Sequence, residues 1–397
     1  MRTLAGSALA AALLVLVACS PDQPDPTDPG GAGPAAVGAA AVAADAGFFL
    51  AQVTAGGYHS CGLTADGRAW CWGFGLFGEL GTGDTANRRR PAAVAGPRRY
   101  LQISAGTWHT CAVGTDSLAY CWGKNDYGQL GNNSIRPRST PVRVQGLRKF
   151  VQVDAGSLQT CGVTTAGVVF CWGANYAAQL GNGGTANSRI PVKVLGGHIA
   201  RRVSGSCLLT PAGRAWCWGG ATGDGTALIR TSPVAVAGNH VFRTVAAGGP
   251  ASCGLTAANV AWCWGYNGSG WVGDGTTTDR LIPVRVSGGL AFKQLASGGT
   301  TCGVTTGDRA YCWGGEFAGS LGNGGPDHNE TAPSAVLGGL AFQGVSPGDY
   351  HGCGLTTSHQ AYCWGHNAYG QLGNGIAGPD SLYGFAVSLA PVKVVAP

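Results

Sequence analysis

Charged residues are scarce in this sequence of 397 residues, where they make up 11% against 45% for hydrophobic residues. This hydrophobic share is too high for a disordered chain, which is poor in hydrophobic residues and rich in net charge. The sequence also holds 70 glycines and 20 prolines, a composition typical of β-proteins with many turns. We therefore expect a folded, turn-rich, all-β protein.

Hydrophobic runs long enough to span a bilayer are also lacking. The most apolar stretch, residues 4–17, follows Arg2 and leads through small residues to Cys19. A transmembrane helix needs about 20 apolar residues, so this pattern predicts a secretory signal peptide over residues 1–18. The chain is therefore expected to be exported.

The predicted signal ends in Leu16-Val17-Ala18-Cys19, which resembles the lipobox of bacterial lipoproteins. The resemblance implies cleavage before Cys19 and acylation of this cysteine, which would anchor the protein to a bacterial membrane, facing the periplasm or the cell surface. A plain signal with a stray cysteine is the alternative. Residues 19–47, rich in Pro, Gly and Ala without periodicity, are predicted to form a tether.

Familiar catalytic motifs are lacking as well. There is no phosphate-binding loop ending in Gly-Lys-Ser/Thr and no His-Glu-X-X-His. The 19 acidic residues are spread thinly and form no recurring carboxylate pair. We predict no catalytic residue, metal or cofactor. His59, His109 and His351 share one repeat position and are expected to hydrogen-bond their turn, with metal ligation or base catalysis as the alternative.

What the sequence does contain is a repeat. Seven times, two cysteines stand ten positions apart, and the second lies in an aromatic-Cys-Trp-Gly tetrapeptide. The odd cysteine among the 15 is Cys19. The seven pairs are Cys61–Cys71, Cys111–Cys121, Cys161–Cys171, Cys207–Cys217, Cys253–Cys263, Cys302–Cys312 and Cys353–Cys363.

The first copy predicts a hairpin with a disulfide. Asp66-Gly67 is a turn signal between two runs of strand-forming residues. In this hairpin Cys61 lies opposite Cys71, at the spacing of about 4.5–5.5 Å that suits a disulfide. Zinc is the rival, but its sites normally gather four ligands at short spacing. Gly62, opposite Trp70, is expected to make room for that indole.

Each repeat carries four predicted strands. One leads to an Ala-Gly turn, two form the cysteine hairpin, and the fourth is marked by Pro-X-X-Val, which suits an outer edge strand. Four strands repeated seven times predict a seven-bladed β-propeller over residues 48–397. The last such strand, Pro391 to Val394, is expected to lie beside the first repeat and close the ring.

Four motifs stand out in the repeats: Ala-Gly-X-X-His-X-Cys (55–61), Leu-Thr-X-Asp-Gly (63–67), Cys-Trp-Gly (71–73) and Asn-X-X-Gly-Gln-Leu-Gly (125–131). On these motifs the chain resembles the regulator of chromosome condensation repeat family. The resemblance implies a seven-bladed propeller. Both cysteines depart from the family's usual pattern, and this departure is expected of an exported chain.

One face is predicted to contact partners, and a separate basic sector is predicted that is either a solvated rim or a patch for a polyanionic partner. The Ala-Gly turns and the long loops after Cys-Trp-Gly should emerge on one face, where aromatic and apolar side chains form a partner-binding face. Blades 1 and 2 should carry a basic sector. The residues of the first set are Tyr58, Trp108, Leu158, Tyr350, Phe74, Phe77, Trp271 and Phe317. Those of the second are Arg88, Arg89, Arg90, Arg98, Arg99, Arg136 and Arg138.

These features favour a cell-envelope lipoprotein, expected to be monomeric, whose rigid propeller binds another protein or an envelope polymer. A glycan-active propeller enzyme is an alternative. A guanine-nucleotide exchange factor or chromatin-binding protein, as in the eukaryotic family member, is disfavoured because the export signal separates the chain from such partners, and no nucleic acid is expected. The fourth repeat is irregular and short around Cys207, which predicts a notch in the binding face.

Overall fold

Twenty-eight β-strands in seven sheets make up the computed structural model, which describes residues 48–325, 328–378 and 386–397. The predicted signal peptide, the tether and the acylation of Cys19 all lie outside the described residues. Within the described ranges, no helix has the length and apolar character that crossing a membrane requires.

Every sheet contains four strands that follow one another in the chain. Blade 1 is β1 (Gln52–Ala55), β2 (His59–Leu63), β3 (Ala69–Gly73) and β4 (Arg88–Ala93); blade 2 is β5 (Tyr100–Ala105), β6 (His109–Gly114), β7 (Ala119–Gly123) and β8 (Arg138–Arg143). Blade 3 is β9 (Phe150–Ala155), β10 (Gln159–Thr164), β11 (Val169–Gly173) and β12 (Ser188–Lys193); blade 4 is β13 (Arg202–Ser204), β14 (Cys207–Leu209), β15 (Ala215–Gly219) and β16 (Arg230–Ala235). Blade 5 is β17 (Phe242–Ala247), β18 (Ala251–Thr256), β19 (Ala261–Gly265) and β20 (Arg280–Arg285); blade 6 is β21 (Phe292–Ser297), β22 (Thr301–Thr305), β23 (Ala310–Gly314) and β24 (Glu330–Ala335). Blade 7 is β25 (Phe342–Pro347), β26 (His351–Thr356), β27 (Ala361–His366) and β28 (Val387–Lys393).

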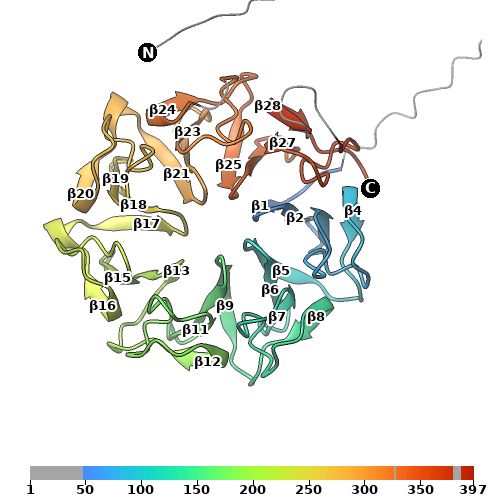
Figure 1. The fold of residues 1–397 in the computed structure, drawn as a ribbon, viewed down its shortest axis with the longest axis horizontal. Helices are drawn as coiled ribbons and strands as arrows, with labels where there is room; N and C mark the ends of the chain where they lie inside the picture. Colours follow the sequence, from blue (N-terminus) through green and yellow to red (C-terminus); the bar gives the residue numbers. More distant parts are fainter. Residues whose placement is uncertain (1–47, 326–327, 379–385) are drawn as a thin grey trace, which may run out of the picture. The chain divides into compact units, whose positions relative to one another are not determined.

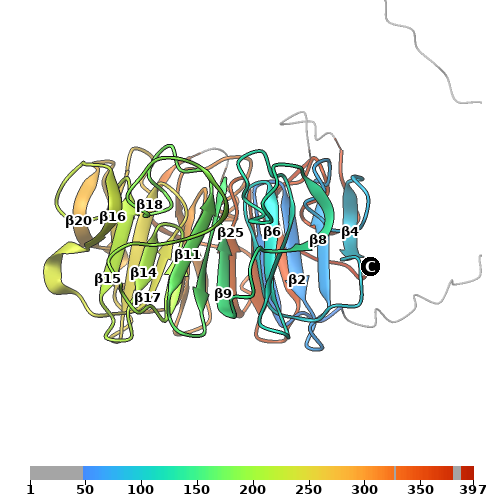
Figure 2. The same cartoon turned by 90° about the horizontal axis from the view of Figure 1, so that it is seen from below.

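The seven sheets stand in a ring, with the first strand of each blade innermost (Figure 1). The predicted seven-bladed, all-β propeller is therefore confirmed. Because the strands alternate in direction, the two ends of each blade form the two faces of the ring (Figure 2). We call the face with the turns between first and second strands and the long loops between third and fourth strands the loop face. The opposite face, with the Asp-Gly turns, is the turn face.

The cysteine hairpin has the predicted register. Cys61 pairs with Cys71 across β2 and β3, and Thr64 and Arg68 close the turn. The two cysteines form a disulfide, with their Cα atoms 4.1 Å apart. All seven predicted pairs are bonded in the same way, so these cysteines are not zinc ligands.

The hydrophobic core lies between neighbouring blades. One face of each blade presents the disulfide, and it packs on the face of the next blade that presents the Cys-Trp-Gly indole. At the first interface, Cys61 and Cys71 share a cluster with Leu80 and with Trp122 of blade 2. The corresponding tryptophan is fully buried in every blade, which makes the sequence motif a blade-to-blade contact.

Gly62 makes room for a different side chain than predicted. A Cβ atom on Gly62 would meet Leu50 at 2.6 Å, and one on Gly162 would meet Phe150 at 2.8 Å. These two side chains come from just before β1 and from the start of β9, so the glycine accommodates the beginning of the innermost strand. Trp70, which faces Gly62, remains half-buried.

The ring closes by side-chain packing together with a few backbone contacts, among them an isolated β-bridge between Phe49 and Gln360. The last strand, β28, pairs with β27 inside blade 7 rather than with the first repeat, which corrects the prediction for Pro391 to Val394. Blades 7 and 1 instead share a core cluster that contains Leu50, Trp72 and Val394. The Leu50 N–H also donates to the His359 carbonyl at 3.0 Å.

Candidate functional site

Aromatic side chains gather on the loop face where blades 6, 7, 1 and 2 meet. They come from the turns before the second strands and from the loops after Cys-Trp-Gly. The fold brings the loops of the last repeats against those of the first. We call this group the aromatic cluster; its members are Tyr58, Phe74, Phe77, Trp108, Phe317, Tyr350, His366 and Tyr369.

The rings of the cluster form one continuous set of contacts around Tyr58. Its ring stacks on Tyr350 with centroids 4.6 Å apart and lies 5.3 Å from Trp108. Burial and the neighbouring Tyr350 hydroxyl raise the pKa of Tyr58, so its phenol stays neutral. At the rim, Phe77 and Phe317 are 37% and 47% exposed. The cluster is thus held rigidly by its own contacts and exposes apolar edges to solvent.

A lysine and a buried carboxyl group border the cluster. The Lys124 ammonium lies 4.9 Å from the centroid of Phe77 and 5.6 Å from that of Trp108, and it pairs with Asp126. Beneath them, Glu79 is fully buried and accepts a hydrogen bond from the Phe77 N–H at 2.9 Å. Burial raises the pKa of Glu79 to about 7. At the rim of the cluster, the Lys124 ammonium thus lies over the faces of Phe77 and Trp108.

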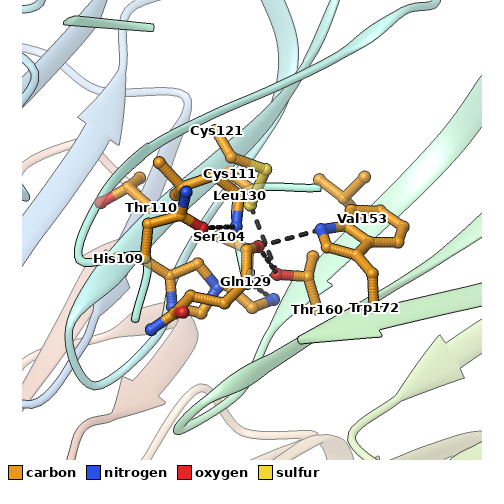
Figure 3. Close-up of a disulfide and its surroundings, with 12 residues drawn as sticks. Ser104, His109, Thr110, Cys111, Cys121, Gln129, Leu130, Val153, Thr160 and Trp172 are labelled. Atoms are coloured by element: carbon orange, nitrogen blue, oxygen red, sulfur yellow. Dashed lines mark hydrogen bonds between the residues drawn. A yellow bond between two sulfur atoms is a disulfide. The ribbon is translucent and has the colours of Figure 1, made fainter. Parts of the chain in front are cut away.

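The three repeat histidines were predicted to hydrogen-bond their own turns, and this prediction is wrong in its partner: their side chains bond to hydroxyl groups of the next blade. His109 Nε2 lies 2.8 Å from the Thr160 hydroxyl of blade 3, which donates to the Gln129 carbonyl at 2.9 Å (Figure 3). Since that hydroxyl proton is used on the carbonyl, the proton between His109 and Thr160 resides on Nε2. His59 and His351 form the same hydrogen-bond chain through Thr110 and Ser60.

The buried position of these histidines decides their protonation state. His59, His109 and His351 are each at most 1% exposed, and burial lowers the pKa of each to about 3. They are neutral at physiological pH. Among the described residues, no group of three His, Cys, Asp or Glu side chains is placed to hold a metal ion.

The central channel is lined by the innermost strands and has a volume of about 230 Å³. Asp154 accepts a hydrogen bond from the Gly205 N–H at 2.6 Å, and Asp349 accepts one from the Thr107 hydroxyl at 2.7 Å. Burial raises the pKa of both carboxyl groups, that of Asp154 to about 6. Each carboxyl group thus joins two blades.

One serine sits in a sequence pattern that is also found at hydrolase nucleophiles. Residues 344–348 read Gly-Val-Ser-Pro-Gly, the spacing of a nucleophile elbow. However, Ser346 lies within β25 rather than on a strand-to-helix turn. Its hydroxyl accepts the Ala55 N–H at 3.1 Å. Thr54 and Ser104 hold the next blade in the same way, so this serine has a structural partner.

Most of the predicted partner-binding residues lie together, but two do not. Trp271 donates through Nε1 to the Gly299 carbonyl at 2.7 Å and packs between blades 5 and 6. Leu158 lies outside the cluster, on blade 3. Sequence reasoning missed His366 and the role of Tyr369. His366 follows Cys-Trp-Gly directly, as Phe74 does, and this shared repeat position was the available signal.

The predicted basic sector is divided between two surfaces. Arg89, Arg90 and Arg138 lie on the outer strands β4 and β8. Arg98 and Arg99 lie after β4, on the turn face, where Arg98 covers the Tyr120 ring at 4.2 Å and Arg99 approaches Asp66. Arg88 pairs with Asp84, and exposed Arg136 precedes β8. The seven arginines are thus distributed over the outer strands and the turn face of blades 1 and 2.

Sequence comparison matches this chain to a repeat model. Residues 66–113, 116–163 and 166–207 match the regulator of chromosome condensation (RCC1) repeat, and residues 50–79, 101–129 and 343–371 match a second model of that repeat. A stretch of 48 residues is 38% identical to the mitochondrial RCC1 domain-containing protein RUG3 of Arabidopsis thaliana. That match covers 12% of this chain and 11% of RUG3.

Solved structures share the fold. Prp20p from Saccharomyces cerevisiae, described with its binding properties to Gsp1p and histones, superposes with a TM-score of 0.73 at 20% identity, covering 84% of this chain and 87% of Prp20p. Human WBSCR16 gives a TM-score of 0.52 at 22% identity over 88% of this chain and 83% of its own. At these identities the likeness concerns the propeller fold.

Proposed function

Because the chain belongs to the regulator of chromosome condensation (RCC1) repeat family, we propose that its propeller is an exported binding scaffold whose aromatic cluster docks a protein partner. The cluster is the observation that carries the proposal. The contacting Tyr, Trp and Phe rings, with Phe77 and Phe317 exposed at 37% and 47%, have the aromatic composition that is enriched at the cores of protein interfaces. A single lysine at the rim adds polarity without breaking the apolar surface.

The seven disulfides support export. Such bonds persist in oxidising compartments outside the cytoplasm, and each here joins strands in the core between blades. The lipobox-like segment ending at Cys19 adds a membrane anchor to the proposal, with residues 19–47 as its tether. A role with the partners named for Prp20p, Gsp1p and histones, is less compatible with a disulfide-rich chain.

A capture experiment tests the docking surface. The oxidised protein serves as bait against the envelope fraction of its source organism, beside a Phe77→Ser/Phe317→Ser variant. A Leu147→Ser/Tyr176→Ser variant is the matched control, because both side chains are exposed outside the aromatic cluster. We expect the native protein and the control to retain the same partner and the Phe variant to lose it. Equal retention by all three baits would place the docking surface elsewhere.

A further inference from the structure

The inter-blade hydrogen-bond chain is interrupted at blade 4. In blades 1, 2 and 7 a histidine donates to the hydroxyl that precedes the next blade's cysteine. In blade 3 this histidine is replaced by Gln159. In blade 4 the strands β13 and β14 have three residues each and are joined by a tight turn at Gly205 and Ser206, so the histidine position is lost.

Three polar groups are left without partners by this interruption. Gln159 uses its Oε1 atom on the Leu158 N–H, at 3.3 Å, and its Nε2 group makes no hydrogen bond within the described chain. The hydroxyls of Ser206 and Ser252, which precede Cys207 and Cys253, also make none there. The matching hydroxyls of Thr110 and Thr160 are both bonded.

All three groups line one cavity of about 230 Å³, large enough for several water molecules at about 30 Å³ each. Its other walls include Pro250, the Cys207–Cys217 disulfide and the ring of Tyr266, which is 58% exposed. None of the residues that line it is charged. We call this cavity the blade-4 notch and define it by Gln159, Ser206, Gly220, Ser252 and Tyr266.

We propose that the blade-4 notch binds a neutral saccharide unit. A sugar ring presents several hydroxyls on one side, which pair with the amide of Gln159 and the hydroxyls of Ser206 and Ser252, and C–H groups that pack on the Tyr266 ring. An ion would find no opposite charge in the notch. A wholly apolar ligand would cover three polar groups and leave them unpaired, which disfavours its binding.

The notch is independent of the aromatic cluster. The cluster lies over blades 6, 7, 1 and 2, whereas the notch is built from blades 3, 4 and 5. A side chain of a protein partner is the competing occupant. A protein side chain offers one polar group, whereas the notch holds three unpaired ones. A sugar offers several hydroxyls, so the unpaired donors and acceptors favour the sugar. Sugar binding in the blade-4 notch therefore does not depend on the proposal that the aromatic cluster docks a protein.

Saturation-transfer NMR tests the assignment, with glucose, galactose, mannose and N-acetylglucosamine added one at a time to the oxidised native protein. We expect transfer to the ring protons of at least one sugar. Gly220→Leu should abolish it by filling the notch, because a Cβ atom there meets nothing within 4 Å and the fold tolerates it. Ser252→Ala should weaken binding about 2- to 10-fold, as expected for one hydrogen bond.

Matched tyrosine variants keep the test decisive. Tyr266→Ala should reduce the transfer, whereas Tyr176→Ala, which removes an exposed ring outside the notch, should leave it unchanged. The proposal is overturned if none of the four sugars receives transfer from the native protein, or if the transfer survives in Gly220→Leu. It is also overturned if no sugar binds while Gly220→Leu abolishes capture of a protein partner, because the notch then belongs to a protein interface.

Discussion

Glu79 occupies a position where three other blades have glutamine. Gln129, Gln179 and Gln371 accept the backbone N–H two residues earlier at 2.8–3.0 Å, as the Glu79 carboxyl does. The second carboxyl oxygen of Glu79 is buried and has no hydrogen-bond partner in the structure. A charged form is therefore poorly tolerated, which is the physical cause of its raised pKa.

Glu79→Gln should stabilise the protein at neutral and alkaline pH. The folded state holds a proton on Glu79 up to about pH 7, whereas the unfolded chain loses it near 4.5. The stability from this group is therefore complete below pH 4.5 and is lost as the pH rises through 7. The melting-temperature difference between Glu79→Gln and the native protein should grow from pH 4.5 to 7 and then level off. A difference that does not vary with pH would show that Glu79 is charged in the folded state.

The buried histidines give the stability of the protein a pH dependence opposite to that from Glu79. Their folded pKa of about 3 lies below the usual 6.5, so stability present above pH 6.5 is lost as the pH falls toward 3. His109→Gln introduces the residue that blade 3 already carries at this position. The variant should take up about one proton fewer on unfolding near pH 5, measured from the pH dependence of the unfolding free energy. Unchanged proton uptake would contradict the buried, neutral state of His109.

At the level of the hairpin, the sequence predicted what depends on local chemistry. The turn at Asp66-Gly67 and the alternation of side chains are local, so the Cys61–Cys71 pairing followed from them. The side chain that packs on Gly62 could not be predicted in this way, because Leu50 lies just before β1, outside the hairpin. Likewise the histidine partners lie about 50 residues away on the next blade, a contact that one repeat alone does not reveal.

The packing of the innermost strand's first side chain against a glycine can be tested by mutation in blade 3, with stability as the readout. Gly162→Ala places a methyl group 2.8 Å from the Phe150 ring and should destabilise the protein by about 1–3 kcal/mol, as overpacking usually does. Combining it with Phe150→Ala, which removes the ring that the methyl group meets, should cost less in chemical denaturation than the sum of the two single changes. Strictly additive effects would show that the two residues do not contact.

For the whole molecule, the repeat count predicted the number of blades but not the mode of closure. The Pro-X-X-Val pattern of 391–394 is the same in closing and ordinary blades, so the sequence alone could not tell strand exchange from side-chain packing. The aromatic cluster depends on this closure, because it joins loops from both ends of the chain. Most of its residues were predicted individually from their repeat positions. Their contacts with one another could be seen only in the closed ring.

Closure by packing makes Leu50 a global determinant of stability. Leu50→Ala should cost about 2–5 kcal/mol, because it opens a cavity in the cluster between blades 7 and 1. We expect one cooperative unfolding transition at a lower denaturant midpoint, with Leu101→Ala, an exposed control, unchanged. Increased hydrogen exchange confined to blades 1 and 7, with the other blades as stable as before, would contradict closure of the ring by this contact.

The most direct measurement of the central claim is photo-crosslinking in the living source organism. A photoreactive phenylalanine analogue replaces Phe77 or Phe317 in the aromatic cluster, or Leu101 or Val151 as exposed controls outside it. The account predicts that one and the same protein is crosslinked from both cluster positions and from neither control position. Equal crosslinking from all four positions, or crosslinking from the controls alone, would contradict the assignment of the aromatic cluster as the docking surface.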